Sequence, residues 1–254
     1  MSVEFGKTAE DYGKYRAGFP PEFFRRVGAY GVGFAGQALL DLGTGTGTLA
    51  RGFARQGCRV IGLDPAEAML EEAAALDAEA GVKVDYRVGR AEETGLPAES
   101  FDAVTAGQCW HWFDRPRAAR EAVRLLRPGG VLVIAHFDWL PLPGNMVEAT
   151  EALILRHNPA WKGAGGKGIY PWWFGDLTMA GLEGIESFSC DILAPYSHEA
   201  WRGRLRASAG VGASMTPEQV EIFDRELQAL LTARFAEEPL QVPHRVFAVL
   251  GRRP

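Results

Sequence analysis

The sequence predicts an α/β fold: a doubly wound sheet of about seven strands, with an inserted cover region rich in aromatic residues and glycine. Between residues 39 and 136, short apolar runs alternate with helical stretches, a rhythm typical of βαβ units and a parallel sheet. The apolar runs are short enough to be buried strands of such a sheet. The length of 254 residues suits one large domain, because a single core stops growing near ~250–300 residues.

Each element of the alternating region has its own local signal. The third apolar run alternates apolar with polar residues, the second helix is rich in Ala and Glu, and a Pro-Gly-Gly turn precedes the fifth run. In chain order we expect a strand at 39–42, a helix at 46–56, a strand at 59–63, a helix at 65–79, strands at 82–88 and 101–106, a helix at 115–126 and a strand at 131–136.

The C-terminal part predicts the elements that complete the sheet. The apolar runs 185–192 and 242–250 are expected to be two closing strands, with helices between them. One of these helices begins after Thr216, because Thr216 and Gln219 form a capping box with proline at the first helical position. We assign no chemistry to this helix.

The regular rhythm breaks after His136. Residues 139–182 are rich in aromatic residues, proline and glycine, as expected of a loop-rich cover over a binding site. We expect the glycine-rich stretch 163–168 to be a hinge and the aromatic side chains to form the apolar wall of a binding pocket. The expected wall residues are Trp161, Tyr170, Trp172, Trp173 and Phe174.

Composition and charge exclude several classes of protein. Hydrophobic residues make up 47% and charged residues 23%, which predicts a globular chain with a sizeable core rather than disorder. The net charge of −5 is the opposite of what a nucleic-acid surface needs, so we expect no nucleic-acid partner. The longest apolar run, 131–135, is far below the ~20 residues that span a bilayer, so we expect no membrane partner.

The ends of the chain and its cysteines give two further expectations. Residues 1–7 lack the charged-then-apolar layout of a secretion signal, so a cytoplasmic location is expected. Cys58, Cys109 and Cys190 are odd in number and form no Cys-x-x-Cys pair. We therefore expect reduced, mostly buried thiols and no metal site.

The most informative motif is the glycine-rich segment 41–47, Asp-Leu-Gly-Thr-Gly-Thr-Gly, placed where a strand ends and a helix begins. Glycines let a ligand approach the backbone there, and the helix N-terminus offers free N–H groups, so a nucleotide-like ligand is expected. Residues 45–50 also match the dinucleotide fingerprint G-x-G-x-x-A, with Asp64 at a compatible distance. Asp41 separates the alternatives, because its carboxylate would repel a pyrophosphate but could organise water and backbone donors around an ammonium and a sulfonium.

With this motif, the sequence resembles the small-molecule branch of the class I S-adenosylmethionine-dependent methyltransferases, methyltransferase type 11-like, over residues 12–136. The resemblance implies a Rossmann-like sheet, S-adenosyl-L-methionine as cofactor and a small-molecule acceptor. It also implies a division of the chain: cofactor-lid helices at 1–36, the cofactor-binding core at 37–138, the substrate cover at 139–182, and closing strands and helices at 183–254, which add part of the cover.

The same resemblance implies a set of cofactor-binding residues. In the family, the glycine segment wraps the methionine part, the acid at the second strand end holds both ribose hydroxyls, and a small residue followed by an acid contacts the adenine. Arg90 replaces the commoner acid beside that last pair, and Arg16 could meet the methionine carboxylate. The implied residues are Tyr15, Arg16, Asp41, Gly43, Thr44, Gly45, Asp64, Pro65, Met69, Ala91, Glu92 and Gln108. Tyr12 belongs to the same N-terminal segment.

Several of these residues also have structural interpretations. Asp64 stands before a proline with Glu67 three residues on, which is a good helix N-cap whatever the function. Glu92 could be a solvated loop acid. The turn after the fourth strand, Trp110-His111-Trp112-Phe113, resembles the family's aromatic motif beside the methyl group, although both tryptophans could be core residues.

The expected acceptor side follows from these aromatic and histidine residues. Substrate contacts are expected from Trp110, Trp112, Tyr170, Trp172 and Trp173. His111 is the best candidate base, and His136 with Asp138 follows the fifth strand at the crevice where open α/β sheets bind ligands. His111 could equally be structural, and His157, His198 and His244 are expected to be surface or structural residues.

Methyl transfer from a sulfonium is an in-line displacement, so the protein mainly aligns the reactants, and a base is optional. O-, N- and carboxyl-methylation remain open, as do monomer and homodimer. The chain lacks the Asn/Asp-Pro-Pro-Tyr signature of amino-methylating DNA enzymes. The alternatives are an NAD(P)-dependent oxidoreductase, weakened by Asp41 and by the lack of a clear Tyr-x-x-x-Lys pair, and a non-catalytic binder of adenosyl ligands.

Overall fold

The structure is a computed structural model that describes residues 18–254. Tyr12, Tyr15 and Arg16, to which the sequence assigns cofactor contacts, lie outside the described residues. Two compact units can be distinguished in the chain. The larger comprises residues 18–137, 169–190 and 246–254, and the smaller contains residues 138–168 and 191–245.

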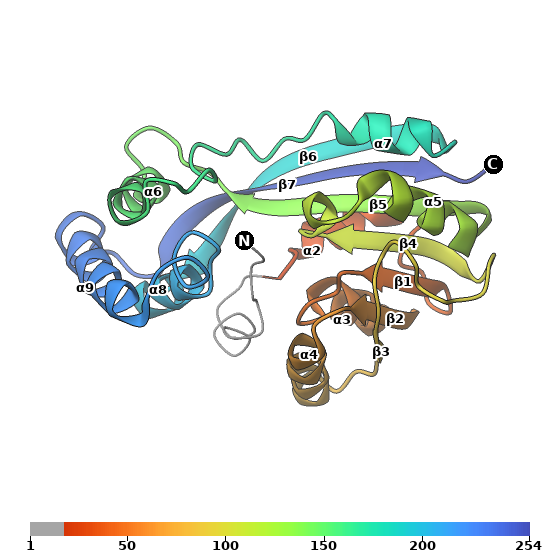
Figure 1. Cartoon of the computed structure of the whole chain (residues 1–254), viewed down its shortest axis with the longest axis horizontal. Helices are drawn as coiled ribbons and strands as arrows, with labels where there is room; N and C mark the ends of the chain where they lie inside the picture. The colour runs from red at the N-terminus through yellow and green to blue at the C-terminus, as the bar shows by residue number, and fades with distance from the viewer. Residues whose placement is uncertain (1–17) are drawn as a thin grey trace. The chain divides into compact units, whose positions relative to one another are not determined.

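Seven strands form one sheet in the order β3-β2-β1-β4-β5-β7-β6 (Figure 1). Their bounds are β1 Ala38–Leu42, β2 Arg59–Asp64, β3 Asp85–Val88, β4 Phe101–Gly107, β5 Leu126–Trp139, β6 Glu183–Tyr196 and β7 Leu240–Arg252. The first five strands pair in parallel, and β7 runs opposite to its neighbour β5. The predicted α/β sheet of about seven strands is therefore confirmed.

The helices follow the strands as the βαβ rhythm predicts. Their bounds are α2 Pro21–Gly28, α3 Thr48–Arg55, α4 Glu67–Ala80, α5 Arg115–Leu125, α6 Met146–His157, α7 Trp173–Met179, α8 His198–Arg206 and α9 Pro217–Arg234, with a 3₁₀ turn at Trp110–Trp112. The Thr216–Gln219 capping box that begins α9 is present, with Thr216 as N-cap and bonds in both directions. On the inner side of this helix Phe223, Leu227 and Leu231 are fully buried.

Alternate residues of the strands point to opposite faces of the sheet, and helices cover both faces. One face packs against α5 and α7. Its buried strand residues include Leu40, Leu42, Val104, Ala106, Leu132 and Ile134. The other face carries a group of phenylalanine rings from α2 and α3, with Phe24 and Phe53 at 5.1 Å between ring centroids. Asp41 and Thr105 lie on this second face, because they alternate with the residues that face α5 and α7.

Some element boundaries differ from those expected. The helix expected at 46–56 begins only at Thr48, because Gly45 and Gly47 adopt positive φ angles of 55° and 77°. The third strand is shorter than expected, Asp85–Val88 instead of 82–88. Leu126 begins β5 rather than ending α5, and the strand continues through the Pro-Gly-Gly segment.

The cysteines and helices agree with the sequence expectations where the structure tests them. Cys58 and Cys109 are buried and Cys190 is half-buried, and no disulfide joins any of the three. Within residues 18–254, no helix is both long enough and apolar enough to cross a membrane. The expected cover 139–182 contains α6 and α7, and its functional boundaries remain predictions.

Candidate cofactor and acceptor site

The glycine segment forms a tight loop between the end of β1 and the start of α3. Gly43, Gly45 and Gly47 all have positive φ angles, which L side chains rarely adopt. A Cβ on Gly43 would lie 2.9 Å from the Cys109 sulfur, whereas one on Gly45 would meet only the Met69 methyl group, at 3.5 Å. Gly45 is therefore the open position of the loop, and Gly43 is needed for packing.

Asp41 anchors this loop from within the core. The side chain is only 2% exposed, and its two carboxylate oxygens accept hydrogen bonds from the hydroxyls of Thr44 and Thr105, both at 2.7 Å. Burial raises the pKa of Asp41 to about 6, although the two threonine hydroxyls oppose the rise. This placement favours holding the loop in shape over touching a ligand, and the predicted cofactor role of Asp41 remains a prediction.

Asp64, the last residue of β2, joins the loop to the second strand. One carboxylate oxygen accepts from the Gly45 N–H and the other from the Ala66 N–H, both at 2.9 Å. Burial raises the pKa of this half-buried carboxyl. The N-cap of α4 is Ala66, so the alternative in which Asp64 is the N-cap is wrong: Asp64 lies two residues before the N-cap and bonds the Ala66 N–H. Pro65 beside it is exposed.

A buried polar network below the loop was missed in the sequence. Arg51 pairs with Asp77 of α4 at 2.6 Å and donates to the Thr46 carbonyl at 2.8 Å, while the Tyr86 hydroxyl donates to Asp77 at 2.9 Å. The Tyr86 oxygen lies 2.1 Å from where a Cβ of Gly47 would be. The absence of a side chain at Gly47 therefore leaves room for the Tyr86 hydroxyl. This pairing cannot be recognised in the sequence, because the two residues are brought together only by the fold.

The predicted adenine contacts lie beyond β3. Ala91 is buried, and the Glu92 side chain is only 7% exposed, so the alternative of a solvated loop acid is wrong. Glu92 accepts a hydrogen bond from the Asp114 N–H at 2.9 Å and lies 3.5 Å from the Arg90 guanidinium. It thus ties the turn after β3 to the start of α5.

Gln108 follows β4 with a positive φ of 62°, which is unusual for a residue with a side chain. Its backbone N–H donates to Ala135 at 2.8 Å, and its side-chain amide donates to the Phe137 carbonyl at 3.1 Å. Met69 is buried beside the loop. The predicted cofactor residues therefore lie at the carboxyl ends of four parallel strands, where open α/β sheets bind ligands. The glycine loop lies at the end of β1, Asp64 at the end of β2, Glu92 after β3 and Gln108 after β4.

The two candidate bases lie in one group of rings. The His111 and His136 rings are 5.2 Å apart, and Tyr170 lies 4.5 Å from His136. His111 is exposed, whereas His136 is only 5% exposed. Trp112 lies 4.7 Å from His111, and its side chain is half exposed. The structure thus brings both histidines and part of the predicted acceptor wall together.

The remaining wall residues divide into core and surface. Trp110 and Trp173 are fully buried; the Trp110 indole N–H donates to Asp176 at 2.9 Å, and Trp173 stacks on Tyr170 at 4.3 Å. Trp172 is 57% exposed. Trp172, with Tyr170 and Trp112, is therefore better placed to meet an acceptor than Trp110 or Trp173, whose substrate contacts remain predictions.

Comparison with known proteins places this geometry in a family. A model described as a methyltransferase domain matches residues 40–134. An uncharacterized methyltransferase of Mycobacterium tuberculosis is 38% identical over 132 residues, 52% of this chain and 51% of the relative, so the chain spans about half the length of this relative. A ubiquinone biosynthesis O-methyltransferase of Azorhizobium caulinodans is 38% identical over 180 residues, 68% of this chain and 67% of the relative.

Solved structures agree at the level of the fold. A structure described as a type II methyltransferase of Anaeromyxobacter dehalogenans has a TM-score of 0.64 at 24% identity, covering 94% of this chain and 97% of that one. A Haemonchus contortus N-methyltransferase in complex with S-adenosylhomocysteine has a TM-score of 0.59 at 19% identity, covering 100% of this chain and 61% of that one. The chain belongs to the class I S-adenosylmethionine-dependent methyltransferases.

Proposed function

We propose that this protein transfers a methyl group from S-adenosyl-L-methionine to a small-molecule acceptor. The observation that carries the proposal is the pair of carboxylates at adjacent strand ends: Asp41 and Asp64 bond the glycine loop from both sides. The O-methyltransferase relatives support a small acceptor. A cytoplasmic location, a monomer or homodimer, and no nucleic-acid or membrane partner are part of the same proposal.

The residues present fit such a cofactor. Gly45 leaves open space at the centre of the loop, and each Asp64 oxygen accepts one backbone N–H, which leaves each a further lone pair for a ribose hydroxyl. When bound, S-adenosylmethionine supplies an activated methyl group on a sulfonium. The loop, Asp64, Met69, Ala91, Glu92 and Gln108 are the described residues that would hold it.

The chain's own contribution to the reaction is alignment and, for some acceptors, proton removal. His111 is exposed beside the buried His136, so His111 would take the proton of a hydroxyl or amine while His136 orients its ring. A carboxylate acceptor would need neither histidine. Trp112, Tyr170 and Trp172 would supply the apolar wall.

The test is calorimetric titration of the protein with S-adenosylmethionine, S-adenosylhomocysteine and NAD(H), followed by transfer of a labelled methyl group to a panel of phenols, amines and carboxylates. We expect micromolar binding of the two adenosyl compounds, no response to NAD(H), and one labelled acceptor class. In Asp64→Asn, binding should weaken about 10- to 150-fold, because charge-assisted hydrogen bonds contribute about 1.5–3 kcal/mol.

Asp85→Asn is the matched control, because Asp85 is an exposed carboxylate whose ion-pair partner among the described residues is Arg87, nearby on the same strand. Binding of NAD(H) instead of the adenosyl compounds would overturn the proposal. Tight adenosyl binding with no labelled product from any class would leave the non-catalytic alternative.

A further inference from the structure

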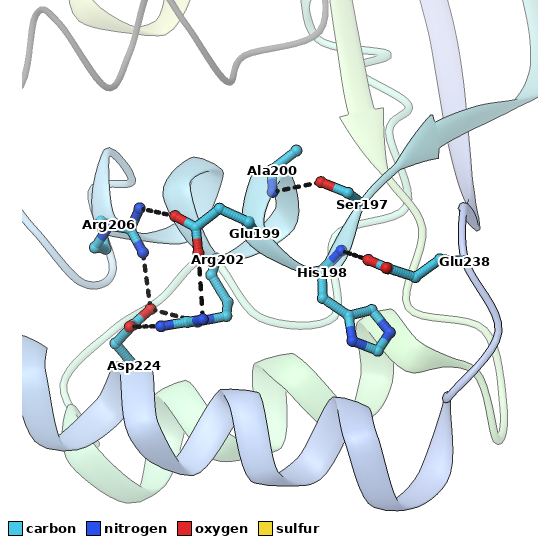
Figure 2. Close-up of polar contacts among 8 residues, drawn as sticks. All are labelled: Ser197, His198, Glu199, Ala200, Arg202, Arg206, Asp224 and Glu238. Carbon is cyan, nitrogen blue, oxygen red and sulfur yellow. Dashed lines mark hydrogen bonds and ion pairs between the residues drawn. The ribbon is translucent and has the colours of Figure 1, made fainter.

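Arg204 in α8 differs from its neighbours on the same helix. Arg202 and Arg206 both pair with Asp224 of α9 and with Glu199, as Figure 2 shows. The acids hold the pKa of both guanidinium groups above their usual range, mainly through the Asp224 bond for Arg202 and, against the effect of burial, the Glu199 bond for Arg206. Each of the two flanking arginines is therefore paired with two carboxylates.

Arg204 has no such carboxylate. Within residues 18–254, none of its nitrogen atoms lies within 4.0 Å of an acidic oxygen, and its buried Nε has no hydrogen-bond partner. The guanidinium instead lies over the ring of Trp139, 4.9 Å from the ring centroid. A partly buried cation without a counter-ion among these described residues is costly, and an anion bound beside it would offset that cost.

The surface that receives Arg204 is rigid. The Trp139 indole N–H donates to Glu151 at 2.8 Å, and the second Glu151 oxygen accepts from the Gly165 N–H at 2.8 Å. Glu151 is 4% exposed, so its charge is committed to these two bonds. The ring that carries the guanidinium is therefore fixed in orientation.

The titratable group that interacts with Arg204, His244, does not neutralise it. His244 is fully buried, and its Nδ1–H donates to the Val242 carbonyl oxygen at 2.9 Å. Burial, aided by the positive charge of Arg204, lowers the pKa of His244 to about 4, so the ring is neutral at pH 7. Asp138 interacts electrostatically with His244 and forms no ion pair with Arg204.

We propose that Arg204 on the face of Trp139 binds an oxyanion, a carboxylate or phosphate, of a small molecule. A guanidinium is planar and matches both groups through two parallel N–H bonds, and stacking on an aromatic ring leaves its edge available for them. All residues of this site belong to the smaller unit. The identification of the small molecule as the methyl acceptor rests on the proposed function.

The experiment measures binding of benzoate, phenyl phosphate and neutral benzamide to the full chain by tryptophan fluorescence and calorimetry, without S-adenosylmethionine. We expect the wild type to bind at least one anion about tenfold or more tightly than benzamide. Arg204→Met should lose this preference and Arg204→Lys should retain part of it. The tighter of benzoate and phenyl phosphate identifies which oxyanion the site takes.

Arg234→Met is the matched control, because Arg234 lies over an aromatic ring in the same unit, 5.3 Å from the Phe235 centroid, but its side chain is exposed. Cooperative urea unfolding followed by circular dichroism reports that each variant is folded. Equal affinity for anions and benzamide in the wild type, or an unchanged preference in Arg204→Met, would overturn the site.

A transfer assay with labelled methyl groups separates the two proposals. If the bound anion is the acceptor, Arg204→Met should raise the KM of anionic acceptors about tenfold or more and leave S-adenosylmethionine affinity unchanged. Arg204-dependent anion binding without any methyl transfer would contradict the proposed function and leave the oxyanion site standing. Methyl transfer to acceptors whose KM ignores Arg204 would contradict the acceptor assignment.

Discussion

At the scale of single residues, His111 decides whether the site provides a base. His111 is the exposed member of the histidine pair, so its ring can reach an acceptor hydroxyl or amine. The His136 ring is buried and cannot reach the acceptor directly. For such acceptors, His111→Ala should lower kcat by about 10²–10⁴-fold and leave S-adenosylmethionine affinity nearly unchanged.

The control for His111→Ala is His157→Ala, because His157 pairs with Glu226 in the other unit. Steady-state kinetics and calorimetry on the same preparations give both quantities. If kcat survives the loss of His111, the acceptor loses no proton to that side chain, and a carboxylate acceptor becomes the better choice.

Asp41 makes stability depend on pH, because its pKa rises from an ordinary 3.8 to about 6 in the folded protein. A carboxyl with a raised pKa stabilises the folded state at low pH, where it is protonated in both states, and this contribution is lost as pH rises through the folded pKa. Between pH 4 and pH 7 the loss amounts to about 2.4 kcal/mol of the ~3 kcal/mol that the whole shift represents, since one pKa unit is about 1.4 kcal/mol.

Asp41→Asn removes the titrating group and should therefore gain stability relative to the wild type as pH rises over this window. The measurement is urea unfolding of both proteins at pH 4, 5, 6 and 7. Loss of the two threonine hydrogen bonds lowers the unfolding free energy of the variant at every pH. The readout is therefore the slope, against pH, of the difference in unfolding free energy between the variant and the wild type. Parallel stability curves would show that the Asp41 carboxyl titrates normally.

At the scale of elements, the start of α3 depends on a fit between a glycine and a tyrosine. Gly47→Ala would place a Cβ 2.1 Å from the Tyr86 hydroxyl, at a φ of 77°. The variant should lose several kcal/mol of unfolding free energy and bind S-adenosylmethionine more weakly, because the loop must move. Adding Tyr86→Phe removes the clashing oxygen and should restore about 1–2 kcal/mol despite the lost bond to Asp77.

A double-mutant cycle by urea unfolding measures this coupling. Tyr86→Phe alone is the control, since it removes the hydroxyl without the clash and should cost about 1 kcal/mol. Additive effects of the two substitutions would mean that the loop and β3 are independent, contrary to the structure.

The sequence predicts elements better than it predicts their ends. Periodicity identified the seven strands, because the central ones bury apolar runs and β3 alternates apolar with polar residues. The Thr216–Gln219 motif located the start of α9, because capping is a local interaction. The start of α3 was placed too early, because a string of helix-compatible residues does not reveal that Gly47 takes a left-handed conformation. The end of α5 was missed because Leu126 suits either a helix or a strand.

The same limit applies to the site. The glycine motif, Asp64 at the end of the second strand and the His111 turn each lie within one short stretch of sequence, so local patterns reveal them. The Arg51, Asp77 and Tyr86 network joins α3, α4 and β3, and no local pattern links residues so far apart. Burial was equally hidden: nothing in the sequence separates the fully buried Trp173 from the exposed Trp172 beside it.

At the scale of the whole molecule, the segment that matches the methyltransferase model covers only part of the larger unit, which also contains residues 169–190 and 246–254. Residues 40–134 end within β5, and β7 lies next to β5 in the sheet. The core on the α5 face also contains side chains from later in the chain. These are Trp173, Leu177, Leu182, Phe247 and Val249.

A chain truncated to residues 1–137 should therefore fail to fold. It would lose five buried apolar side chains, each contributing about 1.5–3 kcal/mol, which together matches or exceeds the ~5–15 kcal/mol that stabilises a typical domain. It would also expose β5 as an unpaired edge strand, which promotes aggregation. We expect the truncated chain to aggregate or to unfold without a cooperative transition, measured by circular dichroism and size exclusion, whereas co-expression with residues 138–254 should recover folded protein and S-adenosylmethionine binding. A truncated chain that unfolds cooperatively and binds the cofactor alone would mean that the first five strands form an autonomous domain, and that β6 and β7 serve the acceptor side alone.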